Sequence, residues 1–133
     1  MAHSSARKPQ DLVTLELKLL VAQFLLGMAL NLIPNPTNTF ELWSEHIILL
    51  LHVVLALTLI LNAINIYRKA RGSSAKPLAH GGMAAVGAAF LFGVLTLAAP
   101  LANLWSFGMA AAFITAFIVY GKLYLKAKSS LKD

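Results

Sequence analysis

The sequence contains no cysteine and very few charged residues. Without cysteine the chain forms neither disulfides nor thiolate-ligated zinc or iron–sulfur sites. Aspartate and glutamate together number 5, and charged residues make up 12% of the 133 residues, which is about half of their share in an average soluble domain. So little charge cannot solvate the surface of an ordinary globule, and a soluble domain is therefore excluded.

The sequence also lacks the motifs of common enzyme classes. It has no G-x-S-x-G, no H-E-x-x-H and no glycine-rich phosphate loop. We therefore expect no catalytic activity of this chain alone, and an ATP-driven pump is excluded. The net charge of +6 would favour nucleic acid in a soluble protein. Here the basic residues flank apolar segments, which favours lipid headgroups as partners and argues against nucleic acid.

Hydrophobic residues make up 59% of the chain and form long blocks. A helix rising about 1.5 Å per residue needs about 20 apolar residues to cross about 30 Å of hydrocarbon. The blocks predict one domain, residues 1–133, that is an all-α integral membrane protein. We expect transmembrane helices at 12–33, 43–67, 78–99 and 102–125, with polar tails at 1–10 and 126–133. The first block is too long for a signal peptide, so we expect it to remain as a helix.

The positions of lysine and arginine predict how these helices are oriented. All 11 lie in the first tail or near the start of the first helix, in the 68–76 loop, or after residue 121. Cytoplasmic loops carry the Lys/Arg excess, so we expect an up-down-up-down four-helix bundle in a plasma membrane, with both termini cytoplasmic. We expect Glu16 and Lys18 to reach the inner interface by snorkelling, and Tyr120 to mark that interface.

Small residues recur at four-residue spacing in the third and fourth predicted helices. Residues four apart share a helix face, and small side chains let membrane helices approach closely. The pattern predicts close packing of these helices, within one chain across a tight turn at Pro100, or between chains of a homo-oligomer. The residues concerned are Gly81, Ala85, Ala89, Gly93, Gly108, Ala112 and Ala116.

The start of the second predicted helix carries Glu41, Glu45 and His46. Carboxylate and imidazole groups suit several divalent ions, so these residues are candidate ligands of a metal at the outer surface. Ionisable groups near helix ends also reach water at little cost, and solvation at the interface is the alternative.

His52 lies deeper, within the apolar run IILLLHVVLALTLIL. An ionisable group at such a position faces the bundle interior and is a functional-site hypothesis by default. One interpretation is a hydrogen bond to Gln23, to Asn31 or to a backbone carbonyl. The other is axial ligation of haem, for which an apolar slot, a neutral imidazole and small residues are needed.

The run Ser44-Glu45-His46, with His52 further along, resembles the second helix of small four-helix haem-b bundles such as a half of haem A synthase. The resemblance covers only that helix and its preceding loop. It implies haem b as cofactor, with His52 and His46 as ligands. Those bundles place a second histidine at the same depth, whereas His80 opens the third helix on the inner side. Haem would therefore need a dimer, a partner subunit or five-coordinate iron.

Three function classes follow, in order of preference. The first is a structural or accessory subunit of a larger membrane complex, without catalytic activity. The second is a haem-b electron-transfer or haem-handling protein. The third is an oligomeric pore or small-molecule carrier, although we expect no charged residue in the middle of a helix to serve as its coupling group.

Overall fold

A computed structural model describes residues 9–32, 37–98 and 102–129. In this part the chain is all-helical, and each helix is long and apolar enough to cross a membrane, as predicted. The helices are α1 (Pro9–Asn31), α2 (Thr39–Ala70), α3 (Lys76–Ala98) and α4 (Ala102–Ser129). The predicted turn at Pro100 lies outside the described residues, as do most of the two predicted tails.

α2 starts earlier than the predicted residue 43, because side chains cap its first turn. The Asn38 side chain accepts a hydrogen bond from the Glu41 backbone nitrogen at 2.9 Å. In return, the Glu41 carboxylate accepts one from the Thr37 backbone nitrogen at 2.7 Å. Side-chain oxygens that satisfy the free N–H groups of the first turn stabilise a helix start. The helix therefore begins at Thr39, before the apolar block.

At the C-terminal ends of α2 and α4, polar residues continue the helices beyond the apolar blocks. α2 runs through Arg68 and Lys69, and α4 runs to Ser129. Lysine and arginine are good helix formers and are favourable in a last turn, where the helix dipole is negative. The Lys126 ammonium also donates to the backbone oxygen of Ser74 at 2.8 Å, which ties α4 to the connection between α2 and α3.

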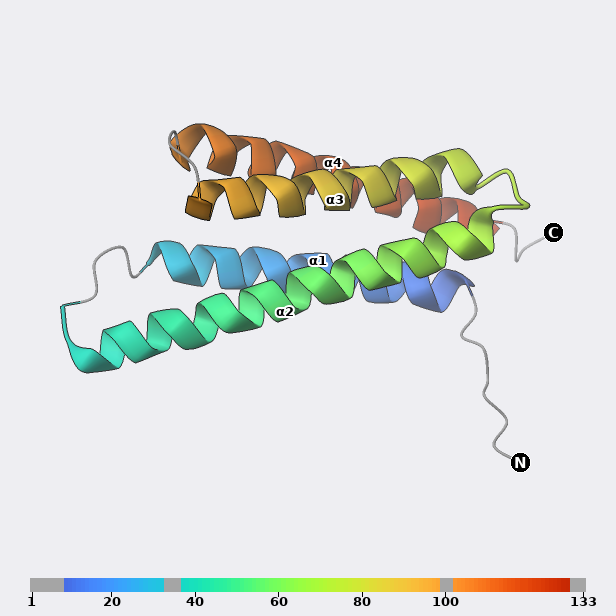
Figure 1. The fold of residues 1–133 in the computed structure, drawn as a ribbon. Coiled ribbons are helices and arrows are strands. Elements are labelled where there is room, and N and C mark those ends of the chain that lie inside the picture. Colours follow the sequence, from blue (N-terminus) through green and yellow to red (C-terminus); the bar gives the residue numbers. More distant parts are fainter. Residues whose placement is uncertain (1–8, 33–36, 99–101, 130–133) are drawn as a thin grey trace, which may run out of the picture.

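Figure 1 shows two helical hairpins, α1 with α2 and α3 with α4. The hairpins meet at the end of the bundle that holds the start of α1 and the end of α4. They diverge toward the opposite end. We call the first the basic end, residues 9–20, 59–86 and 116–129, and the second the open end, residues 21–32, 37–58, 87–98 and 102–115.

The buried core lies entirely in the basic end. Among the described residues, every side chain with less than a tenth of its surface exposed falls within 12–20, 59–70, 79–86 or 116–123. The open end instead exposes large apolar side chains, including Phe24 at 51% and Phe107 at 73%. Packing within this chain therefore fixes one end of the bundle and leaves the other end with apolar surface.

Among the glycines of α3 and α4, Gly82 makes the tightest contact with the other helix. A Cβ atom there would lie 2.6 Å from Cζ of Tyr120, whose ring is fully buried. The glycine leaves room for the phenol ring between the two helices. Tyr120 was expected at the inner interface, and this prediction was wrong, because α3 offers a glycine rather than a side chain at the facing position.

Gly82→Ala tests this contact. A methyl group would overlap the buried ring, and we expect a loss of about 1–3 kcal/mol of unfolding free energy, as for other overpacked cores. Gly87→Ala in the same helix is the matched control, because a Cβ there meets nothing within 4 Å. The control should be unchanged or slightly more stable. Thermal unfolding in detergent, followed by circular dichroism, measures both, and equal stability of the two variants would contradict the packing.

Candidate functional site: polar groups between α1 and α2

Glu16 lies in the core, and the prediction that it snorkels to the interface was wrong. Its side chain is 0% exposed. Asn62 of α2 donates from Nδ2 to the Glu16 carboxylate at 2.7 Å and to the backbone oxygen of Leu12 at 3.0 Å. The partner amide lies across the hairpin, so the glutamate side chain turns inward. Lys18, two positions on, is exposed as expected.

Two polar atoms of this core have no hydrogen-bond partner among the described residues. They are Oε1 of Glu16 and the hydroxyl oxygen of Tyr120, and both are buried. Buried polar atoms without partners are uncommon in folded proteins and cost free energy. An ionisable side chain inside a membrane bundle also marks a candidate functional site. The core therefore holds a carboxyl group whose hydrogen bonding is incomplete.

A second polar pair lies further along the same interface. Nε2 of Gln23 and Nε2 of His52 are 2.9 Å apart. Gln23 was one of the partners predicted for His52. An amide nitrogen only donates, so in this orientation His52 accepts at Nε2, and a neutral imidazole then carries its proton on Nδ1. In the described part of the chain, Nδ1 of His52 and Oε1 of Gln23 have no partner, and both atoms are buried. The pair thus holds one unpaired donor and one unpaired acceptor inside the hairpin.

The two pairs form one line along the hairpin. Glu16 and Gln23 are seven residues apart on α1, so they lie on nearly the same face, about two turns or 10 Å from each other. Gly27 continues this face, and a Cβ there would lie 3.4 Å from Cε1 of His52. The glycine therefore gives the imidazole room beside α1. The line leads from the closed core into the open end, where Gln23 and His52 are only half-buried.

The surroundings of His52 do not fit a haem slot. Nε2, the usual ligand atom, already contacts Gln23, and the backbone of α1 at Gly27 lies against the ring. The ring of His46 bonds through Nδ1 to the Leu42 backbone oxygen of its own helix at 2.7 Å. His80 lies at the basic end, beside Tyr67, with ring centroids 5.8 Å apart. Within residues 9–32, 37–98 and 102–129, no second imidazole is placed opposite His52.

The candidate metal ligands at the start of α2 have other partners. Glu41 accepts from the Thr37 hydroxyl at 3.0 Å in addition to the capping contacts, and His46 bonds to its own helix. Glu45 lies one turn after Glu41 and is half-buried. In the described part of the chain, no group of three or more His, Asp or Glu side chains is placed to hold a metal ion. The metal site stays a prediction.

Several small residues of the predicted stripes face the α3–α4 contact within this chain. A Cβ at Gly93 would lie 3.4 Å from the Met109 sulfur, and one at Gly108 would lie 3.2 Å from the Phe92 ring. Ala85 and Ala116 are buried, whereas Ala89 and Ala112 are half-buried. A Cβ at Gly81 would lie 4.0 Å from Cγ1 of Val119. A role of these stripes between chains stays a prediction.

Sequence reasoning missed the residues that make the tightest contacts. Gly82 lies one position beside the predicted stripe, and Glu16 and Tyr120 were assigned to the interface. The sequence did contain a signal for the burial of Glu16. Glu16 is seven residues from Gln23 and therefore shares its face of α1, and a hydrogen bond from Gln23 to His52 requires this face to point toward α2.

No family model matches the chain, and comparisons with curated proteins and with solved structures gave no significant match.

A double-mutant cycle tests the Glu16–Asn62 contact. Asn62→Leu removes the one side-chain donor to the Glu16 carboxyl group found within the described residues, and we expect it to cost about 1–3 kcal/mol of unfolding free energy. Replacing both residues in Glu16→Leu/Asn62→Leu should recover most of this loss, because neither polar side chain of the pair is then left without the other. Unfolding in mixed detergent micelles measures each variant.

The control is Asn65→Leu, an exposed asparagine on the same helix, which should change stability by less than about 0.5 kcal/mol. If the losses in Glu16→Leu and Asn62→Leu simply added in the double variant, the two side chains would not interact.

Proposed function

We propose that this chain is a non-catalytic accessory subunit of a membrane complex, and that a transmembrane helix of its partner docks in the open end. The observation that carries the proposal is the Gln23–His52 pair. It lies where the hairpins diverge, it is half-buried, and two of its polar atoms, Nδ1 of His52 and Oε1 of Gln23, are buried without a hydrogen-bond partner among the described residues.

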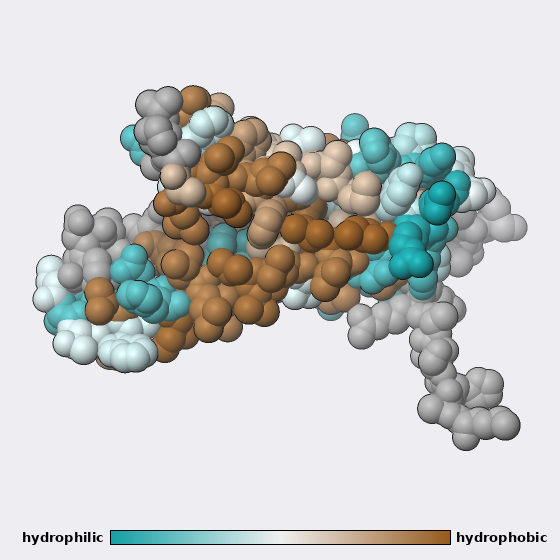
Figure 2. Space-filling view, in the orientation of Figure 1, coloured by the Kyte–Doolittle hydropathy of each residue, from teal (hydrophilic) through white to brown (hydrophobic). Residues whose placement is uncertain are grey.

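The bilayer supplies no hydrogen bonds to such a pair. Polar side chains within a membrane bond to other helices, and those interactions help to hold helices together. A hydroxyl or amide on a partner helix both donates and accepts. Nδ1 of His52 and Oε1 of Gln23 are buried, so such a group would bond to them once the two side chains turn toward the open end. Figure 2 shows apolar surface around the middle and open end of this face, which suits a second helix.

The distribution of charge supports a membrane orientation with both termini cytoplasmic. Every described lysine and arginine belongs to the basic end, which is the hydrophilic end at the right of Figure 2. The start of α1 and the end of α4 lie at this same end. Because cytoplasmic loops carry the Lys/Arg excess, this distribution supports our proposal that the basic end is inside and that the chain is an up-down-up-down bundle in a plasma membrane.

A small-molecule carrier is the second candidate, and Glu16 favours it. We expected no charged residue in the middle of a helix, but the buried Glu16 carboxyl group, near the start of α1, supplies an ionisable group inside the bundle. Carriers place such groups on the substrate path. The closed packing around Glu16 in this structure favours the accessory role over transport.

His52→Ala tests the docking site. We expect a partner that co-purifies with the full chain from its own membranes in mild detergent to be lost or reduced at least fivefold in this variant, because the shared hydrogen bonds contribute about 1–2 kcal/mol. Thr58→Val is the matched control. Thr58 is exposed on the same helix and bonds to its own Val54 backbone oxygen at 2.8 Å, so the partner should be retained.

The same preparations separate the accessory role from the haem alternative. We expect the wild-type protein, expressed with ample haem, to show no Soret band in the oxidised or the dithionite-reduced state. A Soret band that disappears in His52→Ala would contradict the accessory proposal and establish haem ligation. If the His52→Ala variant retained the partner, the Gln23–His52 pair would not be the docking site.

Single-cysteine labelling tests the orientation, and the absence of native cysteine makes it direct. We expect Ser73→Cys, in the connection at the basic end, to react with an impermeant maleimide only after the membrane is opened. Thr39→Cys, exposed at the start of α2, should react in intact cells. The reverse pattern would show that the basic end faces outward.

A further inference from the structure

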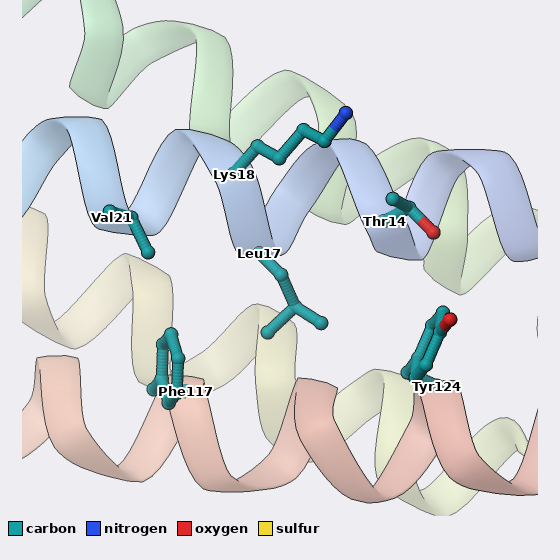
Figure 3. Close-up of a pocket in the computed structure, with 6 residues that line it drawn as sticks. All are labelled: Thr14, Leu17, Lys18, Val21, Phe117 and Tyr124. Atoms are coloured by element: carbon teal, nitrogen blue, oxygen red, sulfur yellow. The ribbon is translucent and has the colours of Figure 1, made fainter.

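Among the residues that the structure describes, the Glu16 carboxyl group has no positively charged partner. It is 0% exposed, and no Lys, Arg or His side chain in that part of the chain is buried. Lys18 is two residues away, so it lies on nearly the opposite face of α1. Figure 3 shows its ammonium group on the side of α1 away from α4. A charge in a low-dielectric interior costs a large free energy unless a partner neutralises it, so the carboxyl group needs a neutralising ligand.

The Tyr120 hydroxyl is the second incomplete group of this core, and it belongs to the other hairpin. Tyr120 is 0% exposed. The Cζ atom that carries its hydroxyl lies against Gly82, which has no side chain to bond to it. The Glu16 carboxyl group is near enough to interact with the Tyr120 hydroxyl electrostatically. Oε1 of Glu16 and the Tyr120 hydroxyl oxygen, both buried and both without a partner among the described residues, thus lie in the same region of the core.

We propose that this region binds a small monovalent cation, a proton or a sodium ion, between Oε1 of Glu16 and the hydroxyl oxygen of Tyr120. Asn62 donates to Oε2 of Glu16, so Oε1 keeps its lone pairs for the cation. A bound proton makes Glu16 a carboxylic acid, which donates from Oε1 to the phenol oxygen. A bound sodium ion contacts both oxygens, because hard cations take oxygen ligands.

The cation has a structural consequence at the basic end. It neutralises the carboxylate, completes both buried atoms and joins α1 to α4. The Asn62 bond already joins α1 to α2 at the same carboxyl group, so the bound cation extends this contact from one hairpin to the other. Glu16 lies about two turns, or 10 Å, from Gln23. The cation site is therefore separate from the docking site at the Gln23–His52 pair and does not depend on it.

Infrared spectroscopy of the full chain in detergent, in sodium-free buffer at neutral pH, tests for the proton. A carboxylic acid has a C=O stretching band that a carboxylate lacks. We expect this band in the wild-type protein and its loss in Glu16→Gln. Glu45→Gln, which changes a half-buried glutamate at the open end, is the matched control and should retain the band. Tyr120→Phe should move the band to higher frequency, because hydrogen bonding lowers the C=O stretching frequency, whereas Tyr124→Phe, one turn further along α4, should not.

Sodium chloride distinguishes the two cations. If the ligand is the proton, the band should persist after sodium chloride is added. If it is the sodium ion, the salt should remove the band and raise the unfolding temperature above that in equimolar choline chloride, and Glu16→Gln should abolish this difference.

Three results would overturn the proposal. The first is a folded wild-type protein with neither the band nor a sodium-specific rise in unfolding temperature, which decides the matter even if Glu16→Gln does not fold. The second is a band that remains in Glu16→Gln. The third is an effect of Tyr120→Phe no larger than that of Tyr124→Phe, with circular dichroism showing that both variants are folded.

Discussion

Polar groups that enter a bilayer must find hydrogen-bond partners inside the protein, and this requirement determines where the helices of this chain meet. Asn62 has the central position. Its amide group reaches both the Glu16 carboxyl group and the Leu12 backbone, so two bonds join α2 to α1 at one depth. The buried apolar residues surround this contact. At the same end, Gly82 admits the Tyr120 ring and brings α3 onto α4.

The divergence of the hairpins has a steric reason. At the basic end, small residues such as Ala63, Ala79 and Ala116 are fully buried and let the helices approach. At the open end, aromatic rings fill the space between helices. Phe24 of α1 stacks on Phe113 of α4 with centroids 5.8 Å apart. Rings of this size hold backbones further apart than alanine does, so the same bundle is closed at one end and open at the other.

The sequence was sufficient to predict the helices but not the interior. Apolar block length determines how many segments can cross a membrane, which is why four helices of sufficient length and apolar character were expected and are found among the described residues. The direction of Glu16 depends on where Asn62 lies, and that is a tertiary contact without a local signal. The burial of Tyr120 likewise depends on a glycine in another helix. The observed helix bounds differ from the predicted ones for local reasons, such as the cap at Asn38. The length of an apolar block contains no information about such caps.

The closed core also controls the geometry of the open end. Glu16 and Gln23 share one face of α1, and each bonds to α2, at Asn62 and at His52. A helix held at two points on one face cannot rotate about its axis, or slide along its neighbour, without breaking both bonds. The orientation of the His52 imidazole, whose Nδ1 is buried on the side of Gly27, is therefore set by packing about two turns away. Stability at the basic end and recognition at the open end are properties of the same helix interface.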